Sequence, residues 1–216
     1  MADRDAKAES LADRIAGVII SGGQSQRWGG GDKFLAELGG RTLLSHVAAR
    51  VRSQVRMTIL NANGKTAQYR GLDMAVVPDA VRGDRGPLAG VLTGFDWVRE
   101  NLPGVPWVLT VPSDAPFLPP DLATRLMAAV EAEGADLACA ASAGRTHPVI
   151  GLWPVALCDR LRHGLLVEDE RKIDAWTAAY RVAQVEWPTD SVDPFFNVNT
   201  RDDLARAEQL LGKMNC

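Results

Sequence analysis

Short apolar runs alternate with segments of helical period along most of the chain, and this alternation constrains the fold more than any other feature. The run at 15–20 is apolar throughout apart from small residues, which is typical of a strand buried on both faces. Leu44, Val47 and Val51 then recur at helical spacing, and Thr42 stands where an N-cap is expected. Strands are predicted at 15–20, 57–60, 74–77, 106–111, 137–141, 149–152 and 181–186, and helices at 43–55, 87–98, 121–130, 154–163, 170–179 and 201–211. Short strands separated by helices predict βαβ units, a mainly parallel sheet and an α/β fold.

The same pattern predicts a single domain. No internal repeat, low-complexity tract or Gly/Ser linker interrupts residues 15–212, so one domain is the simpler count for 216 residues. Residues 1–14 are polar and charged, and we expect them to form a disordered leader. They lack the apolar core of a secretory signal, and no apolar run approaches the roughly 18 residues that a membrane helix needs. We therefore expect a cytoplasmic protein with no membrane association.

Charge and cysteine usage argue against several classes of function. The formal net charge of −3 leaves no broad basic footprint, so nucleic acid is not expected as a partner. Cys139, Cys158 and Cys216 are far apart and odd in number, which is unlike a disulfide framework or a zinc site. The three histidines form no H-E-x-x-H or comparable pair. A catalytic Cys-His pair is therefore not expected.

A glycine-rich loop follows the first predicted strand, where an open α/β sheet binds its ligands. Residues 21–33 hold five glycines, whose backbone N–H groups can approach an anion closely, and Arg27 and Lys33 supply countercharge. The loop fits neither G-x-G-x-x-G nor G-x-x-x-x-G-K-[ST]. The alternative is a flexible loop with solvated charges, but Lys33 at its end favours phosphate binding.

Aspartates also follow predicted strands. Asp114 comes after the strand at 106–111 and lies between two prolines, a good position for a hard cation such as Mg²⁺ together with phosphate oxygens. The alternative is a turn aspartate, and Asp79 is open to the same two interpretations. The basic loop at 82–90 runs into a helix N-terminus, where it could bind an anion or remain solvated.

Two asparagines precede the last predicted helix. With alternating exposure, Asn197 and Asn199 would point to one side, and their amides could reach a metal or phosphate. The alternative is that Asn199 or Thr200 only caps the final helix. The residues alone leave these two interpretations level.

Together these segments resemble the molybdenum cofactor guanylyltransferase family. The resemblance runs from about residue 15 to 211 in the family's order and rests on ISGG at 20–23, RWGGGDK at 27–33, NAN at 61–63, Asp79, GPLAG at 86–90, PSDAP at 112–116, HP at 147–148 and NVNT at 197–200. It implies a Rossmann-like nucleotidyltransferase, a single three-layer α/β/α domain with a mostly parallel sheet. The implied reaction transfers GMP from GTP to the terminal phosphate of molybdopterin, or of Mo-molybdopterin, and releases pyrophosphate. Molybdenum-insertion proteins and acceptor molybdoenzymes are the protein partners that it implies.

The resemblance also implies roles for individual residues. The residues that would bind the nucleotide are Ile20, Ser21, Gly22, Gly23, Lys33, Asn61, Asp79 and Asp114, with Asn197 and Asn199 as further substrate contacts. Asp114 would hold Mg²⁺, Lys33 would contact phosphate, and Arg27 would assist charge stabilisation. Gly22-Gly23 after the first strand points to guanine, since Ala-Gly accompanies CTP in sister enzymes. Trp28 and the triplet at 113–115 depart from the family's usual Met and Cys-Asp-Thr, but neither departure removes a charged group.

The implied chemistry agrees with the residues present. The nucleophile would be a phosphate monoester, which is already anionic at neutral pH, so no general base is required. Catalysis then needs in-line positioning and charge neutralisation. The alternatives are a molybdopterin cytidylyltransferase, another sugar- or alcohol-phosphate nucleotidyltransferase with the same loop, and a nucleotide-binding module without catalysis.

Overall fold

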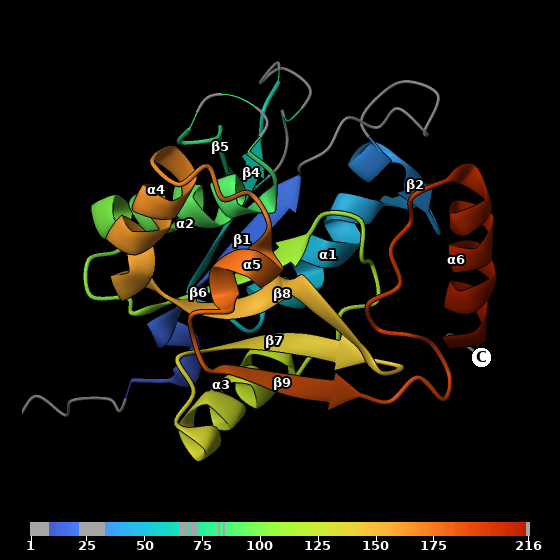
Figure 1. Cartoon of the computed structure of the whole chain (residues 1–216). Helices are drawn as coiled ribbons and strands as arrows, with labels where there is room; N and C mark the ends of the chain where they lie inside the picture. The colour runs from blue at the N-terminus through green and yellow to red at the C-terminus, as the bar shows by residue number, and fades with distance from the viewer. Residues whose placement is uncertain are drawn as a thin grey trace, which may run out of the picture.

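The computed structural model describes residues 9–21, 33–64, 69, 73–81, 83 and 85–214, and it confirms an α/β fold built on one central sheet (Figure 1). The seven strands of that sheet lie in the order β5-β4-β1-β6-β8-β7-β9. Their bounds are β1 Ile15–Ser21, β4 Met57–Ala62, β5 Ala75–Val77, β6 Trp107–Pro112, β7 Leu137–Ser142, β8 Arg145–Pro154 and β9 Val182–Trp187. All neighbouring strands pair in parallel except β8, which is antiparallel to both β6 and β7.

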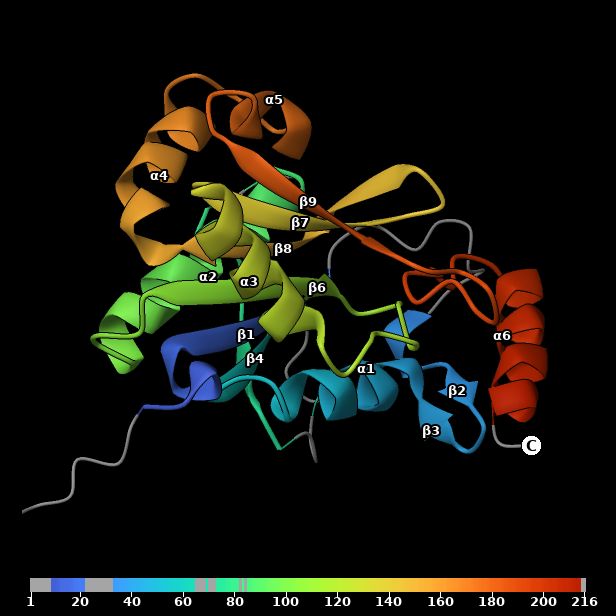
Figure 2. The same cartoon turned by 90° about the horizontal axis from the view of Figure 1, so that it is seen from below.

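Helices cover both faces of the sheet, which gives the predicted three layers (Figures 1 and 2). The helices are α1 Leu43–Arg52, α2 Pro87–Asn101, α3 Leu122–Glu133, α4 Cys158–Leu166, α5 Ile173–Thr177 and α6 Arg201–Met214. Alternate residues of β1 show how the layers form: Ile19 packs in one core with α1 and α3, whereas Val18 packs in a second core with α2, α4 and α5. A strand with apolar residues on both sides is thereby buried on both sides, as its sequence predicts.

The C-terminal helix α6 lies apart from these layers. It packs beside a two-stranded ribbon of β2 Glu37–Leu38 and β3 Arg41–Thr42 (Figure 2). Leu38, Val198 and Ala207 are fully buried in this third core. The third core therefore holds the chain just before α6 close to the carboxyl ends of the central strands.

Several element boundaries differ from the sequence prediction. The helix predicted at 43–55 ends at Arg52, although Thr42 caps it as expected by accepting a hydrogen bond from the Ser45 N–H at 3.1 Å. The segment predicted as a helix at 170–179 is helical only at Ile173–Thr177. The strand predicted at 149–152 extends over Arg145–Pro154 because it pairs with β6 and β7 on its two sides. The β2–β3 ribbon was not predicted.

Short 3-10 helices also form at η1 Leu11–Arg14, η2 Lys33–Leu35 and η4 Val155–Leu157. Ser10 caps η1 in a reciprocal capping box with Asp13, so the end of the predicted leader has local order. Residues 1–8 lie outside the described residues. No helix in the described part of the chain is long and apolar enough to cross a membrane.

Candidate functional site

The site lies where the direction of strand order reverses. β1 pairs with β4 on one side and with β6 on the other, and the chain passes from β5 through α2 to reach β6. Such a reversal leaves a crevice beyond the carboxyl ends of the strands, which is where open α/β sheets bind ligands. The Ser113 N–H donates to the Ile20 carbonyl at 3.0 Å, so Ser21 and Asp114 emerge side by side at this edge.

Lys33 and Asp114 form the centre of the site. The Lys33 Nζ donates to Asp114 Oδ2 at 2.5 Å and to Asn199 Oδ1 at 2.8 Å. The side chains of Lys33 and Asp114 are only 18% and 14% exposed, so their opposite charges meet partly out of water. The three residues come from the start of η2, the turn just after β6 and the segment before α6. The fold thus brings together three side chains that the sequence singled out separately.

The second carboxylate oxygen of Asp114 is available to a ligand. Asp114 Oδ1 is buried and has no hydrogen-bond partner among the described residues. A buried carboxylate oxygen without a partner is costly, and a bound cation removes that cost. The described residues contain no group of three or more His, Cys, Asp or Glu side chains that could hold a metal. The donor set fits Mg²⁺, which binds through one or two carboxylates and takes its other ligands from phosphates and water.

The segment at 197–200 is anchored beside Asp114. The Val198 N–H donates to the Asp114 carbonyl at 2.9 Å, and the Val198 side chain is fully buried. Thr200, not Asn199, caps α6, because its hydroxyl accepts from the Asp203 N–H at 3.1 Å. The Asn199 amide is therefore free to accept from Lys33. Asn197 is exposed, and its side chain has no polar partner among the described residues.

A second polar cluster lies at the end of β4. The Asn61 Nδ2 donates to Asp79 Oδ1 at 2.9 Å and to the Val77 carbonyl at 3.2 Å. Asn63 binds Asp79 twice: its Nδ2 donates to Oδ2 at 2.6 Å, and its Oδ1 accepts from the Asp79 N–H at 2.9 Å. Two amides therefore fix the Asp79 carboxylate. The sequence prediction included Asn61 and Asp79 but assigned no role to Asn63. The spacing of Asn61 and Asn63, two residues apart at the end of a strand, could have identified Asn63 as a partner.

Other predicted residues contribute in different ways. The Ile20 side chain is buried in the core beneath α2, so only its backbone faces the site. Gly22, Gly23 and Arg27 lie outside the described residues, as does most of the glycine-rich loop. Their predicted roles stay predictions.

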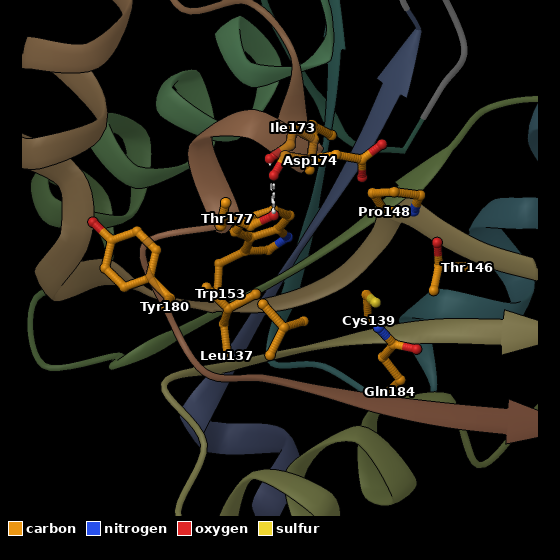
Figure 3. A pocket seen from close by; sticks show the side chains of 12 residues that line it. Leu137, Cys139, Thr146, Pro148, Trp153, Ile173, Asp174, Thr177, Tyr180 and Gln184 are labelled. Carbon is orange, nitrogen blue, oxygen red and sulfur yellow. Dashed lines mark hydrogen bonds between the residues drawn. The ribbon is translucent and has the colours of Figure 1, made fainter.

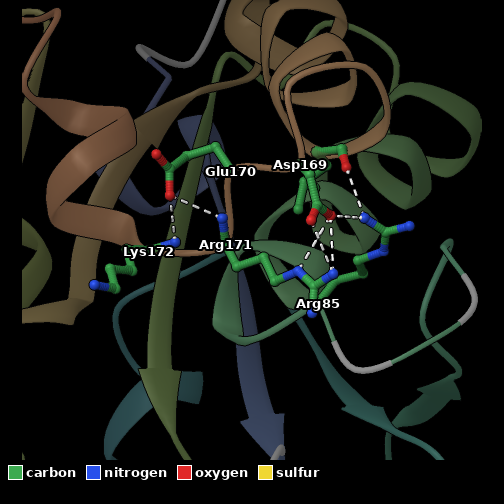
Figure 4. Close-up of polar contacts among 6 residues, drawn as sticks. Arg85, Asp169, Glu170, Arg171 and Lys172 are labelled. Carbon is green, nitrogen blue, oxygen red and sulfur yellow. Dashed lines mark hydrogen bonds and ion pairs between the residues drawn. The ribbon is translucent and has the colours of Figure 1, made fainter.

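The basic loop before α2 is held by an acidic side chain (Figure 4). Arg85 donates to Asp169 and to the Leu165 carbonyl, and Arg171 also donates to Asp169, at 3.0 Å from each carboxylate oxygen. Gly86, the N-cap of α2, has φ of +64°, and a Cβ there would lie 3.0 Å from the Arg171 carbonyl oxygen. The segment at 169–172 therefore packs directly against the start of α2, and Arg85 is paired with a carboxylate rather than simply solvated.

His147 takes part in a hydrogen-bond network with Ser142 and Asp193. Its Nε2 lies 2.7 Å from the Ser142 hydroxyl, which donates to Asp193 Oδ1 at 2.9 Å. A hydroxyl that donates to a carboxylate must accept its other bond, so His147 carries its proton on Nε2. Burial lowers the pKa of His147, which keeps the ring neutral at pH 7. The network ties the chain before Asn197 to β7 and β8.

Fold and site together indicate a class of protein, a Rossmann-like nucleotidyltransferase, whose Lys33–Asp114 pair lies at the strand-order reversal. Residues 17–184 match the family model of the MobA-like NTP transferase domain. The chain is also 53% identical over 203 residues to a molybdenum cofactor guanylyltransferase from Rhodopseudomonas palustris (strain HaA2), covering 93% of this chain and 95% of the relative. This chain belongs to the molybdenum cofactor guanylyltransferase family and is a nucleotidyltransferase enzyme.

Solved structures show the same fold. Molybdopterin-guanine dinucleotide biosynthesis protein A from Archaeoglobus fulgidus superposes with a TM-score of 0.70 at 23% identity, over 92% of this chain and all of that one. A Mycobacterium tuberculosis protein in complex with manganese superposes with a TM-score of 0.65 at 17% identity, over 91% of this chain and 98% of that one.

Proposed function

We propose that this enzyme transfers GMP from GTP to the terminal phosphate of molybdopterin and releases pyrophosphate. The relatives that share half of its sequence carry the guanylyltransferase name, which supports this choice of substrates. The observation that carries the proposal is the Lys33–Asp114 pair with its buried, unpartnered carboxylate oxygen at the strand-order reversal. A cation and a metal-binding carboxylate at this place are suited to a triphosphate.

In the proposed reaction, one phosphorus–oxygen bond replaces another. An oxygen of the acceptor phosphate attacks the α-phosphorus of GTP, and the bond from the α-phosphorus to the bridging β-phosphate oxygen breaks. The acceptor phosphate is already anionic at neutral pH, so the chain need not supply a general base. This agrees with the site, where no histidine or cysteine stands beside Lys33 or Asp114 among the described residues.

The side chains of the site would position the phosphates. Lys33 would exchange its bonds to Asp114 and Asn199 for bonds to phosphate oxygens, and Asn199 would stay within reach of the same group. The Asp114 carboxylate would hold Mg²⁺, which when bound neutralises charge on the triphosphate and on the leaving pyrophosphate. Because the described residues offer one carboxylate here, we expect metal affinity to be low without nucleotide and to rise when phosphate oxygens complete the ligand set.

The Asn61–Asp79–Asn63 cluster would bind the nucleoside. It lies at the end of β4, which pairs with β1 on the side opposite to β6 and Asp114. Its carboxylate is already oriented by two amides, which lowers the cost of ordering it on binding. We infer that this cluster contacts the guanine base or the ribose.

The proposal is tested by coupled measurement of pyrophosphate release and of the guanine–pterin product, with GTP, Mg²⁺ and molybdopterin as substrates. Asp114→Asn keeps the shape of the side chain but removes its charge, and we expect kcat to fall by at least about 100-fold. Removal of divalent metal by EDTA is expected to abolish product formation in the wild type.

The matched control is Asp159→Asn, which makes the same chemical change at a carboxylate that is 79% exposed and pairs with Arg99 in the last turn of α2. It is expected to leave kcat unchanged. Wild-type turnover in Asp114→Asn would overturn the role of Asp114. Product formed from CTP in preference to GTP would overturn the guanylyl assignment in favour of cytidylyl transfer.

A further inference from the structure

A pocket of about 370 Å³ lies between α5 and the face of β7, β8 and β9 (Figure 3). Its apolar wall includes Leu137, Trp153 and Val182, and Tyr180 closes one end. The volume is within the range of about 300–1,000 Å³ that is typical of small-molecule sites. The pocket thus has the size and lining of a site for a flat organic group.

Aromatic contacts make the wall rigid. The Trp153 ring lies 6.2 Å from the Trp176 ring, and the Trp176 ring lies 4.9 Å from the Tyr180 ring. The Trp153 Nε1 also donates to the buried Thr110 hydroxyl at 2.8 Å, which fixes the indole against β6. A preformed wall of this kind favours binding because little side-chain freedom is lost.

The polar groups of the pocket have unused bonding capacity. Asp174 on α5 and Gln184 on β9 line the pocket from different sides, and neither side chain has a hydrogen-bond partner among the described residues. The Asp174 carboxylate extends toward Pro148 (Figure 3) and is near enough to Cys139 to raise the pKa of that thiol beyond the larger effect of burial, to about 11. Cys139 is therefore a neutral thiol, and the one charge in the lining is the carboxylate.

Pro148 marks the end of the pocket that is nearer to the carboxyl end of β6. In β8, Gly151 lies opposite Thr110 of β6, and the two strands run in opposite directions. Pro148 comes three residues before Gly151 in β8 and therefore lies toward the carboxyl end of β6, after which Asp114 follows. A ligand in the pocket could extend a substituent along this edge toward Lys33.

We propose that this pocket binds the pterin ring of the acceptor, with Asp174 as the residue that recognises it; this inference rests on the proposed function. A pterin carries an exocyclic amino group next to a ring N–H, and these two parallel donors match the two oxygens of one carboxylate. The Gln184 amide can pair with the carbonyl and ring nitrogens. The flat bicyclic ring fits the apolar wall, and its substituent carries the phosphate toward Lys33.

Guanine has the same pair of donors, so the experiment must separate the two ligands. We would measure the Kd of pterin and of lumazine, in which an oxygen replaces the amino group, by quenching of pteridine fluorescence, and the Kd of GTP with Mg²⁺ by calorimetry. The proteins are the wild type, Asp174→Asn and the control Asp159→Asn. The KM and kcat for molybdopterin are measured in parallel.

The wild type is expected to bind pterin at least roughly tenfold more tightly than lumazine, the discrimination that one bidentate contact gives. Asp174→Asn should lose this preference, because its amide can donate to the lumazine oxygen, and should raise the KM for molybdopterin with little change in the Kd of GTP. A change in packing alone would weaken both pteridines equally. Asp159→Asn should match the wild type in every measurement.

Three outcomes would overturn the assignment of the pocket: equal binding of pterin and lumazine by the wild type (including no binding of either), unchanged pterin preference in Asp174→Asn, or a loss of GTP affinity in that variant. Each can occur while the wild type still forms product, which leaves the proposed function standing. Conversely, pterin selectivity that depends on Asp174 in an enzyme that forms no product would overturn the proposed reaction and keep the pocket.

Discussion

The Lys33 ammonium, which we propose as a phosphate ligand, is paired with two side chains of the protein itself. It binds Asp114, 81 residues away in the chain, and Asn199, 166 residues away. Pairing lowers the cost of burying either charge, and removing one partner would leave the other uncompensated. The sequence identified all three residues but not their mutual contacts, since a motif marks the kind of residue and not its neighbours in space.

The pH dependence of stability is a prediction at the same scale. Burial lowers the pKa of His147 from 6.5, so the folded state favours the neutral ring. The contribution of His147 to the free energy of unfolding is complete at pH values above its pKa in the unfolded state. It is lost as the pH falls through the lower pKa of the folded state, because the unfolded state then binds more protons. His147→Gln cannot titrate and should lose less thermal stability than the wild type between about pH 7.5 and 5.

Thermal unfolding followed by circular dichroism at steps of pH measures this difference. His163→Gln is the control, since that side chain is 60% exposed, and it should follow the wild type. Parallel curves for all three proteins would contradict the role given to His147.

Helix α2 depends on small residues where it crosses the sheet. A Cβ at Gly94 would lie 2.6 Å from Val18 Cγ2, and one at Gly90 would lie 2.6 Å from Asn61 Oδ1. Both distances are well inside van der Waals contact, so the helix reaches this depth only because these positions have no side chain. Through Gly90, the depth of α2 also decides where the Asn61 amide sits.

We therefore expect Gly94→Ala to destabilise the protein by about 1–3 kcal/mol, because Val18 is a stiff side chain in a packed core. Gly212→Ala is the control within α6, where a Cβ would meet nothing within 4 Å. That change should be neutral or should stabilise the protein by about 0.4–1 kcal/mol, because alanine has less conformational freedom than glycine in the unfolded chain. Urea unfolding measures the stability of both variants, and a shift of the midpoint with an unchanged m-value reports the change in free energy. Equal midpoints for the two variants would refute the packing argument.

At the scale of the whole molecule, β8 joins two parts of the sheet. It runs between β6, which is followed by Asp114, and β7, with which it forms one wall of the proposed pterin pocket. Buried hydrogen bonds connect β8 to β6. The Trp153 Nε1 donates to Thr110 Oγ1 at 2.8 Å, and that hydroxyl donates to the Val149 carbonyl at 2.7 Å. Strand β8 therefore connects the strand that precedes Asp114 to one wall of the proposed pterin pocket.

Thr110→Val keeps the shape of the side chain but leaves the Trp153 N–H and the Val149 carbonyl without their partner. We expect a loss of about 1–3 kcal/mol in the free energy of unfolding. Thr58→Val is the matched control, because the Thr58 hydroxyl is also buried but has no partner among the described residues. It should be neutral or stabilising. Denaturant unfolding of the two variants measures these changes. Equal losses in the free energy of unfolding would show that the hydrogen bonds of Thr110 do not stabilise the protein.

The sequence alone determined the α/β class, most of the strands and helices, and the residue types at the strand ends. These features follow from local periodicity, turn residues and short motifs, which are properties of neighbouring positions. Thr42 as a cap, Lys33 after the glycine-rich loop and Asp114 after β6 were all identified in this way.

Only the tertiary structure decided the antiparallel course of β8, the contact between Lys33 and Asn199, the support of Asp79 by Asn63 and the pocket beneath α5. Each of these depends on segments that are distant in sequence, and the free energy that selects them comes from packing and polar pairing across the assembled sheet. A periodic pattern specifies which face of an element is buried, but it does not specify what that face is buried against.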